Sequence, residues 1–171
     1  GSLTANSSYN PFEVVHAFAR ATGGEGFVLP VPFIVDSPSD RDVLLSQRTV
    51  QQALGIARAT TVAYISIGEL TEGSLLRQQG MISASELAAL RAAGAVGDTN
   101  GIFFDDDGEA VAHPMNARTI ALGFDDLRAA RVVALVAGVA KARAARAFLR
   151  SGIAKGLIVD GDTALQLVAD A

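Results

Sequence analysis

The chain of 171 residues contains no cysteine and no tryptophan, and aromatic residues make up only 6% of it. Without cysteine there is no disulfide framework and no thiolate metal site. The longest apolar run, residues 132–140, is far short of the roughly 20 residues that a membrane-spanning helix needs. The N-terminus also lacks the charged and then apolar lead of a signal peptide. We therefore expect a cytoplasmic protein with no membrane partner.

An excess of basic residues is also missing. The chain has 14 Lys and Arg against 18 Asp and Glu, a formal net charge of −4. A domain that holds the phosphate backbone of DNA needs a basic face, so we expect this chain not to contact DNA by itself. Its length suits a single domain over residues 1–171, which can bury roughly 70% of its unfolded surface. Half of the residues are apolar, so Ala, Val, Leu and Ile should build the core.

Hydrophobic patterning predicts strands that alternate with helices. A helix should begin at Asn10-Pro11 and stop at Gly23-Gly24, and another should run from the capping box of Ser83 and Glu86 to Gly94. We expect two short helices within residues 36–59, divided near Ser46-Gln47, and a hairpin of 102–104 with 109–112. Further strands are predicted at 27–35, 61–67, 119–122, 132–136 and 157–159, and further helices at 141–150 and 163–169. This order predicts an α/β fold with a mostly parallel, doubly wound sheet and helices on both faces.

Ligands of open parallel sheets gather beyond the carboxyl ends of the strands. That rule selects four segments, residues 30–36, 68–70, 97–101 and 138–141. In the last, Gly138 follows a strand and Lys141 opens a helix, whose N-terminal amides favour an anion. A solvated lysine beside Arg143 and Arg146 explains the same spacing equally well, and there is no Walker-type loop.

The segment from Gly97 to Gly101 is the second candidate. Its two glycines allow a ligand to approach the backbone, and Asp98 offers a carboxylate that accepts hydrogen bonds from sugar hydroxyls. Taken alone, however, the residues favour a simple turn in which Asp98 caps its own backbone.

Other site chemistry finds little support. Asp105-Asp106-Asp107-Gly108 lacks the glutamate that a calcium loop needs at its twelfth position, so a turn is the better interpretation. The two histidines show no metal-ligand spacing, and we expect no metal and no cofactor. There is no Gly-x-Ser-x-Gly elbow, although the many acidic residues leave general acid-base chemistry open.

Several segments, in this order, resemble the effector-binding domain of SorC/DeoR-type bacterial transcription regulators that respond to sugars. They are LPVPFIVDS (29–37), SIGEL (66–70), SLLRQQGMIS (74–83), AAGAVGDTNGIFFDDDGEAVAHPMN (92–116), VAGVAK (136–141) and RSGIAKGLIVDGDTAL (150–165). The resemblance runs from about Asn10 to the C-terminus. Its central part, Gly-Asp followed by Gly-x-Phe-Phe-Asp, is the most specific.

The resemblance implies a fold similar to that of ribose-5-phosphate isomerase and glucosamine-6-phosphate deaminase. It implies a phosphorylated sugar, or a related metabolite, as the effector, and operator DNA bound through an attached helix-turn-helix domain. Asp98 would face the effector's hydroxyls and Lys141 its charged or polar end. The other residues expected near the ligand are Gly138, Gly97, Gly68, Pro32, Phe33, Asp36, Ser2 and Thr4. A homo-oligomer, either a dimer or a tetramer, is also expected.

The chain departs from the family pattern in two places. Members often have Gly-Gly before the lysine, where this chain has Gly138-Val139. The family's first strand and its hydroxyl-rich loop should precede the first helix, where only Gly1, Ser2 and Thr4 could represent them. We expect that strand and the helix-turn-helix domain to lie outside these residues. A ligand sensor is the favoured function, with a sugar-phosphate isomerase or deaminase and a purely structural oligomerisation module as alternatives.

Overall fold

The computed structural model describes residues 12–169. Its N-terminal half is mostly helical, with α1 (Phe12–Thr22), α2 (Pro38–Leu45), α3 (Arg48–Arg58), β1 (Val62–Ser66), β2 (Gly68–Glu69), α4 (Leu75–Gln78) and α5 (Ala84–Ala92). The second half contains β3 (Gly97–Thr99), β4 (Ile102–Phe104), η2 (Pro114–Arg118), α6 (Phe124–Arg128), β5 (Arg131–Val136), η3 (Val139–Lys141), α7 (Ala142–Arg150), β6 (Ala154–Val159) and α8 (Gly161–Ala169). Within residues 12–169, no helix is long and apolar enough to cross a membrane.

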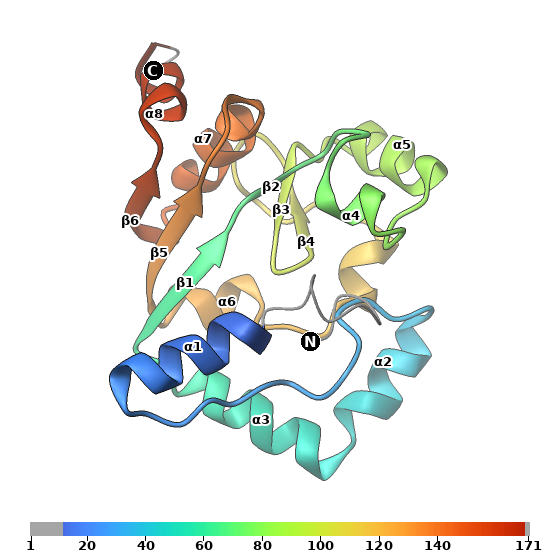
Figure 1. The fold of residues 1–171 in the computed structure, drawn as a ribbon. Helices are drawn as coiled ribbons and strands as arrows, with labels where there is room; N and C mark the ends of the chain where they lie inside the picture. Colours follow the sequence, from blue (N-terminus) through green and yellow to red (C-terminus); the bar gives the residue numbers. More distant parts are fainter. Residues whose placement is uncertain (1–11, 170–171) are drawn as a thin grey trace.

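A parallel sheet in the order β1-β5-β6 forms one half of the fold (Figure 1). Alternate residues of β5, from Val132 to Val136, are buried, because this face of the sheet packs against α6 and α7. Phe104, Phe124 and Phe148 fill the core beneath it, with ring centroids 5.7–6.2 Å apart. The predicted α/β class, with a parallel sheet flanked by helices, is confirmed. The outward side chains Tyr64, Leu135 and Ile158 remain 60%, 38% and 57% exposed in the described part of the chain.

A second sheet is antiparallel, in the order β2-β3-β4, and the sequence did not predict it. β3 and β4 form a tight hairpin through Asn100-Gly101, where φ is +52° and +69°. Asparagine and glycine are the residues that tolerate this left-handed turn. The hairpin predicted between 102–104 and 109–112 is present only in part. One antiparallel bridge joins Phe104 to Ala110, and the Val111 amide donates to the Phe103 carbonyl at 3.0 Å, but the regular ladder of β4 is with β3. The turn expected at Asp105–Gly108 is present, with the Gly108 amide donating to the Asp105 carbonyl at 3.0 Å.

The strands predicted at 27–35 and 119–122 are wrong. The two segments run past each other as irregular chain with one bridge between Ile34 and Thr119. The Val35 amide donates to Arg118 and the Ile120 amide donates to Phe33, both at 3.0 Å. Pro30 and Pro32 have no amide hydrogen to donate, which explains why a regular ladder does not form there.

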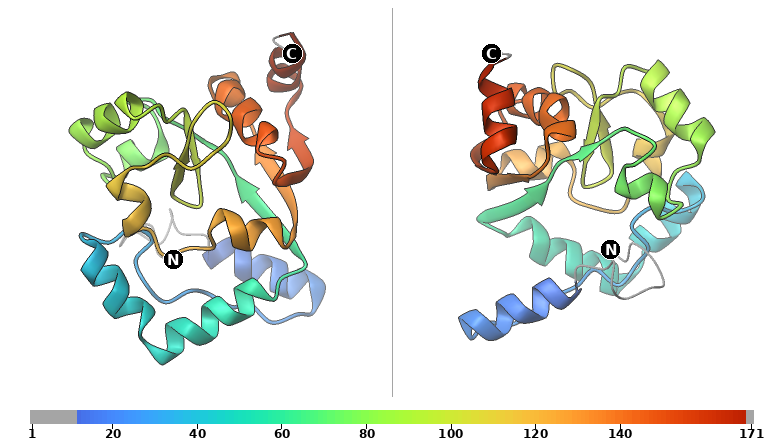
Figure 2. Two further views of the ribbon diagram at one scale, coloured as in Figure 1. Left: turned by 180° about the vertical axis from the view of Figure 1, so that it is seen from behind. Right: turned by 45° about the horizontal axis from the view of Figure 1, so that its top comes forward.

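The sequence predicted the helices more accurately than the strands. Ser83 and Glu86 form the predicted capping box, and α2 and α3 are divided at Ser46-Gln47. Gly23 adopts φ +69° directly after α1. The residues predicted to cap α1, Asn10 and Pro11, lie outside the described range. Figure 2 shows α1 projecting from the rest of the molecule, in agreement with the 69% and 64% exposure of Val14 and Phe18.

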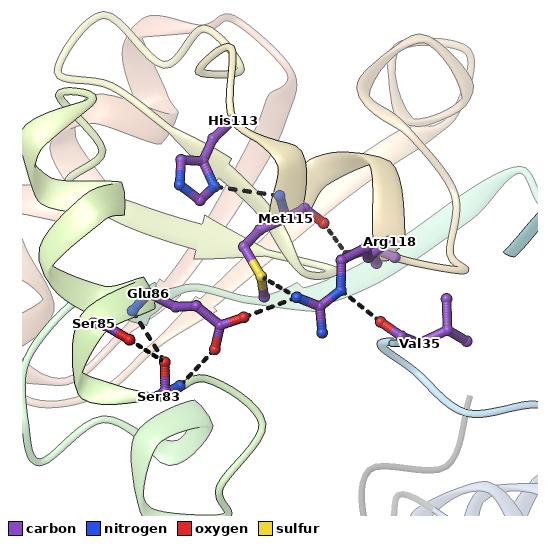
Figure 3. A network of polar contacts seen from close by, with 8 residues as sticks. Val35, Ser83, Ser85, Glu86, His113, Met115 and Arg118 are labelled. Atoms are coloured by element: carbon purple, nitrogen blue, oxygen red, sulfur yellow. Dashed lines mark hydrogen bonds and ion pairs between the residues drawn. The ribbon is translucent and has the colours of Figure 1, made fainter. Parts of the chain in front are cut away.

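Arg118 ties three separate parts of the chain together (Figure 3). Its guanidinium group donates to the Val35 carbonyl at 2.6 Å and to Glu86 Oε1 at 2.8 Å. The other oxygen of Glu86 accepts the Ser83 amide at 2.7 Å, and the contact with this amide holds the pKa of Glu86 below its usual range. One carboxylate thus caps α5 and anchors Arg118, which fixes the irregular segment that carries Phe33.

Candidate functional site

A cavity in the described part of the chain lies beyond the carboxyl end of β1. It has a volume of about 730 Å³, within the range of small-molecule sites. Its walls come from α3, from β1 and β2, from the start of α4, from the β3–β4 turn, from η3 and from the two irregular segments. Four residues selected from the sequence line it, namely Phe33, Gly68, Asp98 and Lys141. The rule that ligands sit at strand ends therefore leads to a real cavity.

Asp98 lies on the wall of this cavity in β3 and is only 8% exposed. β3 pairs with β2 on one side and β4 on the other, and Gly68 faces Asp98 directly across the β2–β3 ladder. A side chain at Gly68 would collide with Asp98 Oδ1, so this glycine makes room for the carboxyl group. The Thr99 hydroxyl donates to the Ser66 carbonyl at 2.9 Å, which fixes the hairpin against the end of β1.

Burial raises the pKa of Asp98 to about 7. A buried carboxyl group loses the hydration that favours its charged form, and the nearby Glu69 carboxylate acts in the same direction. The Gly101 amide, which bonds to Asp98, and the positive charge of Lys141 lower the pKa but do not compensate. Near neutral pH the group can therefore either donate or accept a hydrogen bond, and a sugar hydroxyl can be its partner in both cases.

Lys141 supplies the single positive charge among the described residues that line the cavity. Its Nζ lies 3.9 Å from Glu69 Oε2, and the two side chains are 32% and 17% exposed. Lys141 also directly precedes α7, whose N-terminal end favours negative charge. A ligand anion at Lys141 would thus benefit from both charges but would have to compete with Glu69.

Gly138 does not present its amide to open space, as the sequence suggested. Its amide donates to Asp160 Oδ2 at 2.8 Å, and the Asp160 carboxylate also bonds to the hydroxyl and the amide of Thr163. These three bonds lower the pKa of Asp160 to about 2. Asp160 therefore occupies the position in which the sequence placed an anionic ligand, and Gly138 is absent from the cavity lining. The φ of +104° at Gly138 disfavours any other residue there.

The remaining predicted residues lie apart from the cavity wall. Pro32 and Asp36 are exposed and are not among the lining residues. Gly97 is buried, and a Cβ there would lie 2.5 Å from the Ala144 methyl group and 2.8 Å from the Gly68 carbonyl oxygen. It therefore serves close packing of the hairpin on α7. Ser2 and Thr4 lie outside the described residues.

Among the lining residues that the sequence prediction did not name, Glu69 and Ser74 bear most directly on the chemistry of the cavity. Glu69 stands at a strand end next to the selected Gly68, so its charge was a usable signal. Ser74 is only 3% exposed, and its hydroxyl group has no hydrogen-bond partner in the described structure. No sequence pattern distinguishes such a serine from an ordinary helix cap.

Metal chemistry finds no support in residues 12–169, where no cluster of three or more His, Asp or Glu side chains could hold an ion. The acidic run at 105–107 is used locally instead. Asp106 forms a two-bond ion pair with Arg143, at 2.9 and 2.6 Å, which lowers the pKa of this carboxyl group. Asp105 accepts the amides of Asp107 and Glu109.

Comparison with known proteins shows which family the chain resembles. The family Sugar-bind, described as a "putative sugar-binding domain", matches residues 1–169. The erythritol catabolism regulatory protein EryD of Brucella abortus is 36% identical over 98% of the chain, which covers 53% of that protein. The chain thus spans about half the length of this relative.

Solved structures of transcription regulators have the same fold. A domain of a possible sugar-binding transcriptional regulator from Arthrobacter aurescens superposes with a TM-score of 0.86 at 25% identity, over 98% of this chain and 66% of that one. The full-length sorbitol operon regulator SorC from Klebsiella pneumoniae shares the fold, with a TM-score of 0.86 at 20% identity over 95% of this chain and 53% of that one. These relatives are regulators, which favours a sensor over an isomerase or deaminase. The chain therefore belongs to the Sugar-bind family, the sugar-binding domains of SorC/DeoR-type transcription regulators.

Proposed function

We propose that this domain is the ligand sensor of a transcription regulator and that its cavity holds a phosphorylated sugar. The observation that carries the proposal is the meeting of Asp98 and Lys141 in one cavity of about 730 Å³ at the carboxyl end of β1. Asp98 bonds the sugar hydroxyls, while Lys141 holds the phosphate beside the N-terminal end of α7. In the whole regulator, ligand binding changes how a separate helix-turn-helix domain holds operator DNA. The ligand has this effect because it binds one of two states of the protein more tightly than the other.

The charges of the site support a ligand with both a hydroxylated and an anionic part. Lys141 offers a point charge suited to phosphate, and its side chain is still 32% exposed and can reach a ligand. Asp98 offers an acceptor that is already fixed and largely dehydrated, so less free energy is spent on ordering it when the ligand binds. The name of the Brucella abortus relative places that protein in the regulation of erythritol catabolism, a pathway for a polyol of this hydroxyl-rich kind.

A thermal-shift screen tests the proposal, with ribose 5-phosphate, glucosamine 6-phosphate and their unphosphorylated parents as probes. Ligand at 100 times its dissociation constant adds about 2.7 kcal/mol of stability, a rise in Tm of roughly 5–11 °C for a domain of this size. We expect such a rise with a phosphorylated probe and a much smaller one after Lys141→Ala. Lys155→Ala is the matched control, because Lys155 lies in β6 outside the cavity lining.

Equal shifts in the wild type and in Lys141→Ala would contradict the placement of the phosphate. Turnover of either sugar phosphate would instead favour the isomerase or deaminase interpretation. The dimer or tetramer expected from the resemblance stays a prediction, as does the cytoplasmic location. Sedimentation velocity with and without the probe that binds measures the assembly.

A further inference from the structure

Ser74 is one of the residues that line the cavity, and its hydroxyl group is buried without a hydrogen bond to any described residue. The residue is 3% exposed, so bulk water does not satisfy the hydroxyl either. Buried polar side-chain atoms of native proteins nearly always have a partner, and an unpaired one lowers stability. A hydroxyl group left unpaired at a cavity wall therefore suggests a partner that the protein itself does not supply.

The position of Ser74 makes the missing bond more informative. Ser74 precedes the first residue of α4, where a serine hydroxyl normally accepts a backbone amide of the first helical turn. Ser83 stands at the same position before α5, and its hydroxyl accepts the Glu86 amide at 3.1 Å. The two serines have similar backbone angles, with φ −64° and ψ 152° at Ser74 and φ −77° and ψ 167° at Ser83. The backbone of Ser74 thus permits capping, yet its hydroxyl makes no such bond.

The surroundings of Ser74 show what its hydroxyl could recognise. Leu75 and Leu76 follow it in the same part of the cavity lining, so the hydroxyl is a single polar group in an apolar stretch. Asp98 and Lys141 approach the cavity from β3 and η3, whereas Ser74 belongs to the connection from β2 to α4. A small number of polar groups placed on different walls fixes the orientation of a ligand.

We propose that Ser74 is a ligand-contacting residue whose hydroxyl bonds to a hydroxyl group of the bound sugar. The inference rests on the proposed function and adds a third polar contact to Asp98 and Lys141. A serine hydroxyl both donates and accepts, and so does a sugar hydroxyl, so the pair can form whichever way the proton points.

Matched alanine variants of the two serines test this inference. Ser74→Ala and Ser83→Ala remove the same atom from the same helical position, one without and one with a capping bond. Calorimetric titration uses ribose 5-phosphate and glucosamine 6-phosphate, and Tm is measured without ligand. We expect Ser74→Ala to weaken binding about five- to tenfold, the loss of one hydrogen bond, with the Tm of the free protein unchanged or raised because an unpaired buried hydroxyl group is removed. Ser83→Ala should lower Tm by about 2–4 °C and leave affinity unchanged.

The outcomes separate the inference from the proposed function. If the wild type binds a probe and Ser74→Ala binds it equally well, Ser74 does not contact the ligand. If Ser74→Ala lowers Tm as much as Ser83→Ala does, the hydroxyl is an ordinary cap and the inference is wrong. If the wild type binds neither probe, the sugar-phosphate sensor itself is refuted, and the role of Ser74 with it.

Discussion

Replacing Asp98 by asparagine should remove a specific pH dependence of stability. The folded chain holds the proton of this buried carboxyl group more tightly than the unfolded chain does, because burial raises its pKa to about 7 from 3.8. Protonated Asp98 therefore stabilises the fold at low pH, and the stabilisation is lost as pH rises through about 7. Asparagine keeps the shape of the side chain and an oxygen for the Gly101 amide, but it does not titrate.

The size of the effect follows from the two pKa values. With a pKa of about 7 in the folded chain and 3.8 in the unfolded chain, the wild type should lose about 2.5 kcal/mol of stability between about pH 5 and about pH 8. The raised pKa comes from burial and from Glu69, with Lys141 opposing it. Asp160, whose pKa is lowered to about 2, titrates below this window and does not contribute to the loss.

Urea denaturation at about pH 5 and about pH 8, for the wild type and Asp98→Asn, measures the loss. Asp98→Asn is the control for every other titrating group, because these groups are common to both proteins. The wild type should lose about 2.5 kcal/mol more than the variant across this range. An equal loss in both proteins would refute the reasoning, since it would mean that Asp98 is charged in the folded chain throughout.

Two further substitutions test the electrostatics and the packing of the site. Glu69→Gln should tighten the binding of a phosphorylated probe about fivefold and leave its unphosphorylated parent unchanged, because it frees Lys141 from a partly exposed ion pair. Glu72→Gln is the control in the binding titration, because Glu72 lies just after β2 and pairs with Arg77 at 3.0 Å. Weaker binding of both ligands to Glu69→Gln would mean that Glu69 contacts the sugar itself. Gly97→Ala should lower the free energy of unfolding by about 1–3 kcal/mol, because the new methyl group meets Ala144 and the Gly68 carbonyl. Gly55→Ala is the control, because Gly55 lies in α3 with open space around it, and it should raise the free energy of unfolding by about 0.5–1 kcal/mol. If urea denaturation shows no loss of stability in Gly97→Ala, the packing argument is wrong.

Much of the α/β framework could be predicted from local signals. The apolar runs that became β1 and β5 pack against the core through one face of each strand, at Ile65 in β1 and at alternate residues of β5, and their composition reflects this. The capping box at Ser83 is a signal of four residues that needs no distant partner. β6 was predicted too short, beginning at residue 157 instead of Ala154, because Lys155 and Gly156 break its apolar run. Gly156 nevertheless pairs with Val133, and Lys155 lies at an irregularity in the ladder.

The antiparallel sheet and the details of the site depended on contacts that are distant in sequence. Asp98 was selected as a candidate, but the strand that contains it has only three residues. This strand pairs with β2, which lies about thirty positions earlier in the sequence. The hydrogen bond from the Gly138 amide to Asp160 joins residues 22 positions apart, and nothing near Gly138 in the sequence indicates this bond. Likewise, Ser74 and Ser83 look alike as helix caps, and only the three-dimensional structure shows which hydroxyl makes the capping bond.

The tight β3–β4 turn also determines how this protein can acquire a new ligand preference. Gly97 has no room for a side chain, and at Gly101 a methyl group would lie 2.8 Å from Thr119 and 2.9 Å from Phe33, with φ at +69°. In directed evolution the hairpin that carries Asp98 should therefore tolerate few substitutions. The connection from β2 to α4, which follows Glu69 and contains Ser74, has only an ordinary contact at Gly73. Variants with altered sugar preference should accumulate in this connection, where changing a side chain does not disturb the packing of the hairpin.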